Sequence, residues 1–170
     1  MDDLQATYAD IAAIAVAFAG FGTIAVSLGQ RDGGDDAKVD AHRLTNMLTT
    51  SLTVVVAALL PALLAALGVD ARWQLGLPSI AVLGVIAVAT PRLGRRNLAI
   101  RHVSGYNWPA SIANFSSVVV AAGAFLACAL GWPGDRQGGV FLLGLMGLLL
   151  SSVIMFSRVA MSLLLPHNEG

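Results

Sequence analysis

Apolar residues gather into five long stretches along the chain, separated by short segments rich in polar or charged residues. A helix needs about 20 apolar residues to cross the hydrocarbon core of a bilayer, and the stretches approach or exceed that length. Alternation with a period of two, which is typical of outer-membrane strands, is absent. The pattern predicts an all-α, polytopic membrane helix bundle that forms a single transmembrane domain over residues 1–170. Its helices are expected at about residues 8–28, 44–68, 75–90, 109–132 and 139–165, the third being short because Pro91 should end it.

The composition agrees with a membrane protein and narrows the classes of function. Hydrophobic residues make up 56% of the chain and charged residues 12%, with a mean hydropathy of +0.76. Soluble domains carry about 25% charged residues, so a water-soluble globule is excluded. One cysteine rules out a disulfide scaffold, and three histidines without a cysteine cluster rule out a zinc module. A net charge of zero gives no support for nucleic-acid binding. We therefore expect no cofactor, no metal and no nucleic acid, with the lipid bilayer as the surrounding partner.

The positive charges predict the orientation. Two of the ten, Arg72 and Arg136, fall on one side of the expected bundle, and the other eight fall on the opposite side. Those eight are Arg31, Lys38, Arg43, Arg92, Arg95, Arg96, Arg101 and Arg158. Cytoplasmic loops carry an excess of Lys and Arg, so the N-terminus is expected outside and the C-terminus inside. Tyr8, Trp73 and Trp132 are expected to anchor the outer helix ends at the membrane surface.

The two segments on the basic side carry charge without a recognisable ligand site. Residues 29–43 hold four Asp in nine positions, but the spacing differs from that of a calcium loop. We expect a solvated loop in which Asp40 caps the next helix. Residues 92–108 mix Arg with Leu, Ile and Val, which favours a short amphipathic segment on the inner leaflet. That segment either only determines the topology or binds a lipid or phosphate group.

The first helix is unusually rich in small residues. Small side chains let helix backbones approach closely, and helix association in lipid depends on such packing. The stripe is either a packing surface within the chain, or an oligomer seam or the wall of a central pore. Its residues are Ala9, Ala13, Ala17 and Gly20.

Polar side chains inside the helices are concentrated in the inner half of the expected bundle. The candidates are Asn46, Thr49, Thr53, Asn114, Ser117 and Ser151. One hypothesis is a hydrated vestibule that opens to the cytoplasm and is closed outward by an apolar layer. The other is interhelical hydrogen bonding that only fixes the packing, at about 0.6 kcal/mol per pair. Two charges, Asp10 and Arg158, also approach the membrane core, and Arg158 is expected to extend to the headgroups.

Catalysis has little support in the sequence. The three histidines fall in inner loops or the tail, and Cys128 lies among apolar residues. No nucleophile–base set, metalloprotease motif or phosphate-binding Gly loop occurs. The chain is therefore not expected to be an enzyme.

Several short strings lie within the first 70 residues of the chain. Ala-Phe-Ala-Gly-Phe-Gly-Thr-Ile-Ala-Val occupies residues 17–26, and a charged loop, His-Arg-Leu at 42–44, Ser-Leu at 51–52 and Leu-Leu-Pro at 59–61 follow. This succession resembles a group of small, uncharacterised bacterial multi-pass membrane proteins. The resemblance implies a bacterial inner-membrane protein of similar topology, and it implies no activity.

These patterns favour a small inner-membrane protein that assembles as a homo-oligomer and forms a channel or passive conduit. Its polar vestibule would lie on the cytoplasmic side, with the first helix as the seam. The alternative is an accessory or structural subunit that packs against a larger membrane complex and has no chemistry of its own.

Overall fold

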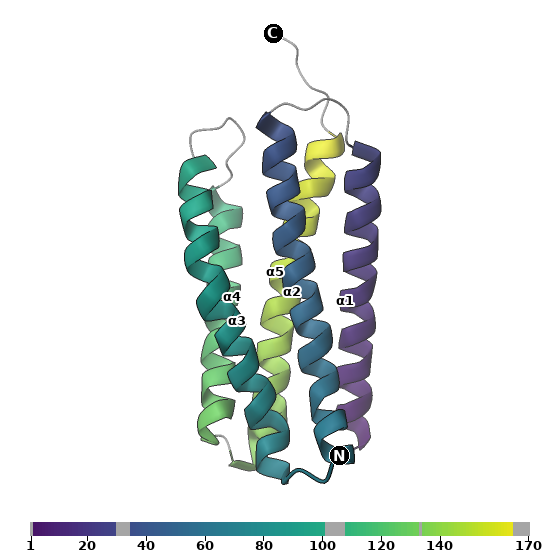
Figure 1. Ribbon diagram of the computed structural model, residues 1–170, viewed down its shortest axis with the longest axis vertical. Coiled ribbons are helices and arrows are strands. Elements are labelled where there is room, and N and C mark those ends of the chain that lie inside the picture. Colours follow the sequence, from purple (N-terminus) through teal and green to yellow (C-terminus); the bar gives the residue numbers. More distant parts are fainter. Residues whose placement is uncertain (1, 30–34, 101–107, 133, 165–170) are drawn as a thin grey trace.

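The computed structural model describes residues 2–29, 35–100, 108–132 and 134–164. Its helices are α1 (Asp2–Gly29), α2 (Asp35–Ala66), α3 (Ala71–Ile100), α4 (Trp108–Leu130) and α5 (Gln137–Leu164), with a short 3-10 helix, η1 (Gly134–Arg136), before α5. Side chains are described for these residues except 2–3, 25–29, 35–43, 93–100, 108, 159 and 162–164. The five α-helices run up and down along one axis (Figure 1). The predicted all-α fold is therefore confirmed.

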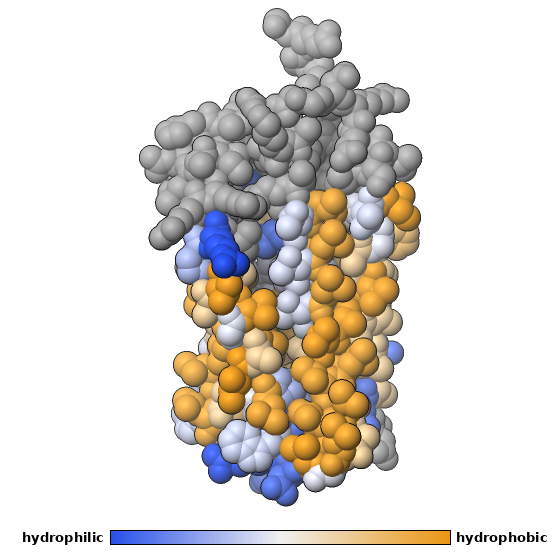
Figure 2. Space-filling model, viewed as in Figure 1, coloured by the Kyte–Doolittle hydropathy of each residue, from blue (hydrophilic) through white to orange (hydrophobic). Residues whose placement is uncertain are grey.

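Each of the five helices is long and apolar enough to cross a membrane. The candidate spans are Leu4–Ile24, Leu44–Ala66, Ala71–Arg92, Pro109–Leu130 and Gly134–Arg158. Apolar side chains cover most of the described surface between the two ends of the bundle (Figure 2). The chain is thus a multi-pass membrane protein by the length and composition of its helices. Which end faces the cytoplasm stays a prediction, so the ends are named here by Figure 1: α1 begins at the lower end, and α5 finishes at the upper end.

Four of the helices form a ring, and the fifth lies outside it. α2 contacts α3, α3 contacts α4, α4 contacts α5, and α5 contacts α2, whereas α2 and α4 do not meet in the described part of the chain. Among the described helices, α1 packs against α2 and α5 only, on the outside of the ring. The interior of the ring is consequently lined by α2, α3, α4 and α5, and one face of α1 is left without a neighbour.

Two predicted helix boundaries are wrong. α3 continues through Pro91 to Ile100 instead of ending there, so residues 92–100 extend this helix rather than forming a separate segment. Proline removes one backbone hydrogen bond, but membrane helices tolerate it where the freed carbonyl finds another partner. α2 begins at Asp35 rather than near Leu44, which places Asp40 inside the helix and not at its cap. The rest of the expected inner segments, residues 30–34 and 101–107, lies outside the described residues.

Glycine ends two helices at the lower end of the bundle. Gly68 and Gly131 adopt positive φ angles of 73° and 68°, a conformation that glycine reaches without strain. The amides of Val69 and Trp132 then bond to carbonyls five residues back, at 3.0 Å and 3.1 Å. This pattern is the Schellman motif, which stops a helix and satisfies its last carbonyls. It fixes the tight turns into α3 and η1.

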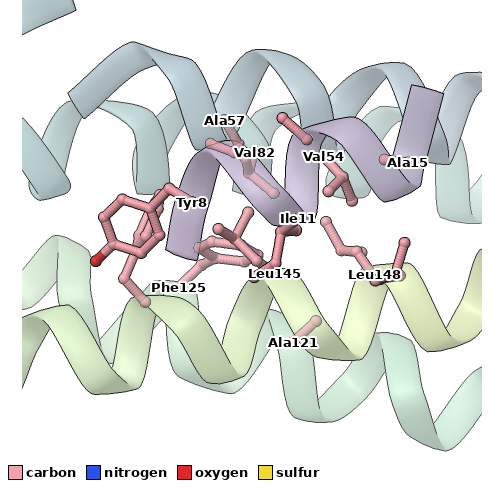
Figure 3. Close-up of a cluster of buried hydrophobic side chains, with 14 of the residues drawn as sticks. Tyr8, Ile11, Ala15, Val54, Ala57, Val82, Ala121, Phe125, Leu145 and Leu148 are labelled. Carbon is pink, nitrogen blue, oxygen red and sulfur yellow. The ribbon is translucent and has the colours of Figure 1, made fainter. Parts of the chain in front are cut away.

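Aromatic rings fill the lower interior of the bundle. The Phe141 ring lies edge-on to Tyr8 and to Phe125, with ring centroids 5.5 Å apart in both pairs. Tyr8 is buried, and its hydroxyl donates to the carbonyl of Gly138 at 3.2 Å. Figure 3 shows Tyr8 and Phe125 with the neighbouring core residues between the helices. Tyr8 is therefore a core residue and not a surface anchor, whereas Trp73 and Trp132 are exposed, as expected of anchors.

The closest helix packing in the ring joins α4 to α5. A Cβ atom placed on Gly147 would lie 3.0 Å from both the Cβ of Ala121 and the backbone oxygen of Ser117. A Cβ atom on Gly144 would lie 2.9 Å from the Phe125 ring. The two glycines thus let α4 lie directly on the α5 backbone, as small residues do at membrane helix interfaces.

Candidate functional site

Two adjacent serines of α5 hold the neighbouring helices by hydrogen bonds. Ser151 Oγ donates to Asn114 Oδ1 of α4 at 2.6 Å. Ser152 Oγ accepts from Ser51 Oγ of α2 at 3.3 Å and donates to the Leu148 carbonyl at 3.4 Å. α5 therefore reaches α4 with one serine and α2 with the next, which joins both walls of the ring at one level.

These groups form what we call the polar cluster, consisting of Ser51, Asn114, Ser117, Ser151 and Ser152. The four serines are buried, with Ser51 and Ser152 fully so, and Asn114 is half-buried. Ser117 completes the cluster by donating to the Asn114 backbone oxygen at 2.8 Å. Buried hydroxyls are costly unless they are bonded, and each serine here donates one hydrogen bond.

One flank of α2 adds a second polar surface beside and above the cluster. The flank consists of three half-buried residues at helical spacing, Asn46, Thr50 and Thr53. The next residue on the same face of the helix is Ala57, which belongs to the core. Thr50 and Thr53 donate to carbonyls four residues back, at 2.9 Å and 2.7 Å. Within the described residues, no hydrogen bond satisfies the side-chain amide of Asn46. The threonine hydroxyls thus keep acceptor lone pairs that point away from their own helix. The side-chain amide of Asn46 keeps both its donors and its acceptor.

The structure brings some of the predicted polar residues together and separates others. Asn114, Ser117 and Ser151 meet in the polar cluster, and Asn46 and Thr53 lie on the α2 flank. Thr49 is exposed on the outer face of α2 and donates to the Thr45 carbonyl at 2.8 Å. A pale, weakly polar strip among apolar side chains is visible in the upper half of Figure 2.

Below the polar cluster the ring interior is apolar. The described core there, which we call the apolar layer, consists of Val54, Ala57, Val82, Ala121, Leu145 and Leu148. These residues come from all four ring helices, are at most 3% exposed, and lie together between the helices (Figure 3). Along α2, α4 and α5 they lie on the lower side of the polar cluster. Ser79 of α3 is an exception in the lower half, and its hydroxyl bonds to the carbonyl of Leu75 at 2.7 Å. The ring is therefore polar toward one end and sealed by packed apolar side chains toward the other.

The two predicted charges lie on opposite halves of the bundle. Asp10 is exposed on α1, in the part of the helix near the lower end. Arg158 is half-buried near the upper end of α5, and its Nη1 atom donates to Ser111 Oγ of α4 at 3.3 Å. Arg158 therefore reaches across the α4–α5 seam, and its extension to the headgroups stays a prediction.

The small residues of α1 face away from the rest of the chain. Ala9, Ala13, Ala17 and Gly20 are all exposed, and no heavy atom lies within 4 Å of a Cβ placed on Gly20. The inner face of α1 carries other residues, among them Ala12 and Ala15. The stripe is thus free to contact lipid or another protein.

The sequence reasoning missed Ser51 and Ser152 as a buried pair between α2 and α5. A signal was present, because Ser51 continues the helical spacing of Met47, Val54 and Ala58, which are all buried. A single hydroxyl on an otherwise apolar helix face requires a partner from another helix.

The site offers hydroxyl and amide groups, which bind water or polar solutes. No group of three His, Cys, Asp or Glu side chains suited to a metal ion occurs in the described parts of the chain. Comparisons of the chain with protein-family models, curated proteins and solved structures find no match. A functional interpretation therefore depends on the geometry of the ring alone.

Proposed function

We propose that this protein is a passive conduit for small solutes in a bacterial inner membrane. The polar upper half of the ring would be its vestibule, open to the cytoplasm, and the apolar layer would be its barrier. The observation that carries the proposal is the one-sided polarity of the ring interior, with the polar cluster above and packed aliphatic side chains below. Hydrophobic constrictions that meet a hydrated cavity are a known means of gating a membrane pore.

The incomplete hydrogen bonding of two asparagine side chains supports a vestibule more than a purely structural role. Asn46 and Asn114 are half-buried, and each keeps amide hydrogen-bonding capacity that no described residue satisfies. Polar groups at membrane depth are costly unless they meet a partner or water. Water in the upper half of the ring would satisfy both amides.

Replacing Asn46 with Leu tests the vestibule. In liposomes loaded with potassium chloride, we expect wild-type protein to dissipate an imposed gradient and Asn46→Leu to do so about fivefold more slowly, because about 1 kcal/mol of solvation is lost. Ser116→Leu is the matched control, since Ser116 is exposed on α4 and donates only to the Ala113 carbonyl. Equal rates for wild type, Asn46→Leu and empty liposomes would contradict the conduit.

We further propose that copies of the chain associate through the exposed small-residue face of α1. A contact through this face would let two backbones approach closely without displacing any contact inside the chain. Mild detergent extraction followed by mass determination should give a multiple of the 17.5 kDa chain, and Ala13→Leu should reduce it to a single chain. A wild-type particle of one chain would contradict self-association. A constant, different protein in the particle would favour the accessory-subunit alternative.

A further inference from the structure

Asp10 places a carboxylate on the outer face of α1, where the described chain gives it no partner. It is exposed and precedes Ala13 and Ala17 by three and seven residues, so it borders the small-residue face. The candidate span Leu4–Ile24 begins six residues earlier, which puts Asp10 about 9 Å inside it. Charges at membrane depth are costly where they face lipid, and they are usually paired. A cation from outside the chain would remove that cost.

A second copy seated symmetrically on α1 does not bring such a cation. Copies that share one orientation in the membrane are related by an axis along the membrane normal, so equivalent residues lie at the same depth. A contact of α1 with α1 would therefore place Asp10 beside Asp10 of the second copy, and like charges repel. Charge favours a head-to-tail contact instead, in which α1 of one copy meets a different surface of the next.

The exposed face of α5 complements the outer face of α1 in shape. Leu143, Met146 and Leu150 follow at helical spacing along α5 and are 53%, 50% and 52% exposed. Because the Tyr8 hydroxyl of α1 bonds to the Gly138 carbonyl of α5, the lower parts of the two helices lie at the same level. The large side chains of α5 are thus presented at the depth where α1 presents small ones. Helices pack well when the side chains of one fill the spaces over small residues of the other.

A cation stands at the lower end of this α5 face. Arg136, the last residue of η1, is exposed, and no described group bonds to its side chain. It precedes Leu143 by seven residues, or about two helical turns. The Tyr8 bond to Gly138 places Arg136 about 10 Å below Asp10 in depth. The Asp10 side chain leans toward the lower end, where α1 begins, and an arginine stem can extend along apolar surface to meet it.

From these observations we infer that copies of this chain join head to tail, with the outer face of α1 seated on the exposed face of α5 of the next copy. The Asp10 carboxylate of one copy pairs with the Arg136 guanidinium of the next, and Met146 packs over Ala13. Because the two faces differ, repetition of the contact gives a closed ring of copies instead of a symmetric pair. The inference rests on the proposed self-association and adds the surface that α1 meets.

Disulfide cross-linking in membranes tests the contact, in full-length chains whose native Cys128 is replaced with Ala. Ala13→Cys chains produced together with Met146→Cys chains should give a mixed cross-linked dimer on mild oxidation. Ala13→Cys chains alone are the matched control and should stay uncrosslinked, because their thiols meet only in a contact of α1 with α1. Absence of the mixed dimer in particles that contain several chains would overturn the inference and leave self-association intact. Wild-type particles of a single chain would overturn both.

Exchange of the two charges gives a second measurement that needs no cysteine. Asp10→Arg and Arg136→Asp should each weaken self-association in mild detergent about tenfold, and the double variant should recover most of the loss. Arg72→Asp is the matched control, since Arg72 also lies at the lower end but stands over the Trp73 ring and against the end of α4. Single variants that associate like the wild type, or a double variant without recovery, would overturn the inference.

Discussion

Replacing Gly147 with Leu is expected to prevent the α4–α5 pair from forming. Even a single carbon at this position would lie 3.0 Å from the Ser117 backbone oxygen and from the Ala121 Cβ, and neither can move without displacing α4. Overpacking of this kind costs about 3 kcal/mol or more, and the polar cluster would lose its geometry together with the seam. We expect Gly147→Leu to give aggregated protein, or a free energy of unfolding in detergent micelles that is lower by at least this amount.

Gly123→Leu is the control for this substitution. Gly123 lies on α4 near Gly147 in depth, but it is exposed and has no heavy atom within 4 Å of a Cβ placed on it. The same change should therefore cost little there. If Gly147→Leu and Gly123→Leu unfold alike, the close approach of α4 and α5 does not hold the ring together.

Replacing Phe141 with Ala is expected to give the second large loss of stability. The side chain is fully buried, and it is the ring that contacts both Tyr8 of α1 and Phe125 of α4. Truncation of a buried phenylalanine typically costs about 3–5 kcal/mol, because it leaves a cavity as well as removing contacts. The free energy of unfolding in detergent should fall by that amount.

Phe115→Ala is the control that separates the effect of burial on stability from the effect of losing any aromatic ring. Phe115 is 62% exposed on α4, so its truncation should change the free energy of unfolding by less than about 0.5 kcal/mol. Equal losses for the two variants would mean that the lower aromatic cluster does not stabilise the bundle.

The number and type of the helices follow from the sequence, because each needs only a long apolar run. The ends of the helices do not follow from the sequence, because they depend on contacts with other parts of the chain that an apolar stretch does not specify. Pro91 is tolerated inside α3, and α2 extends back to Asp35 through a segment whose charges suggest a loop. Tyr8 was expected at the surface, but the Phe141 ring and the Gly138 carbonyl give it a buried site.

The candidate site is only partly readable from the sequence, for a related reason. The concentration of polar residues in one half of the bundle can be read from their positions along the sequence. The rotation of each helix about its axis, which decides where a side chain points, cannot. Thr49 therefore faces outward while Ser51, two residues away, bonds to α5. Likewise, small residues identify α1 as a packing helix, and Gly22 of α1 does lie against Met47 of α2, yet the predicted stripe through Ala13 faces outward.

The central claim, that water occupies the upper half of the ring, is tested most directly by cysteine accessibility. A thiol reacts as the thiolate, which forms in water but not among packed apolar side chains. In membrane vesicles, a membrane-impermeant thiol reagent should modify Asn114→Cys from the cytoplasmic side. Ala121→Cys, two turns lower on the same face of α4, should stay unmodified, as should the buried native Cys128. If Asn114→Cys is as unreactive as Ala121→Cys from both sides, the polar cluster only fixes the packing of the helices and the vestibule does not exist.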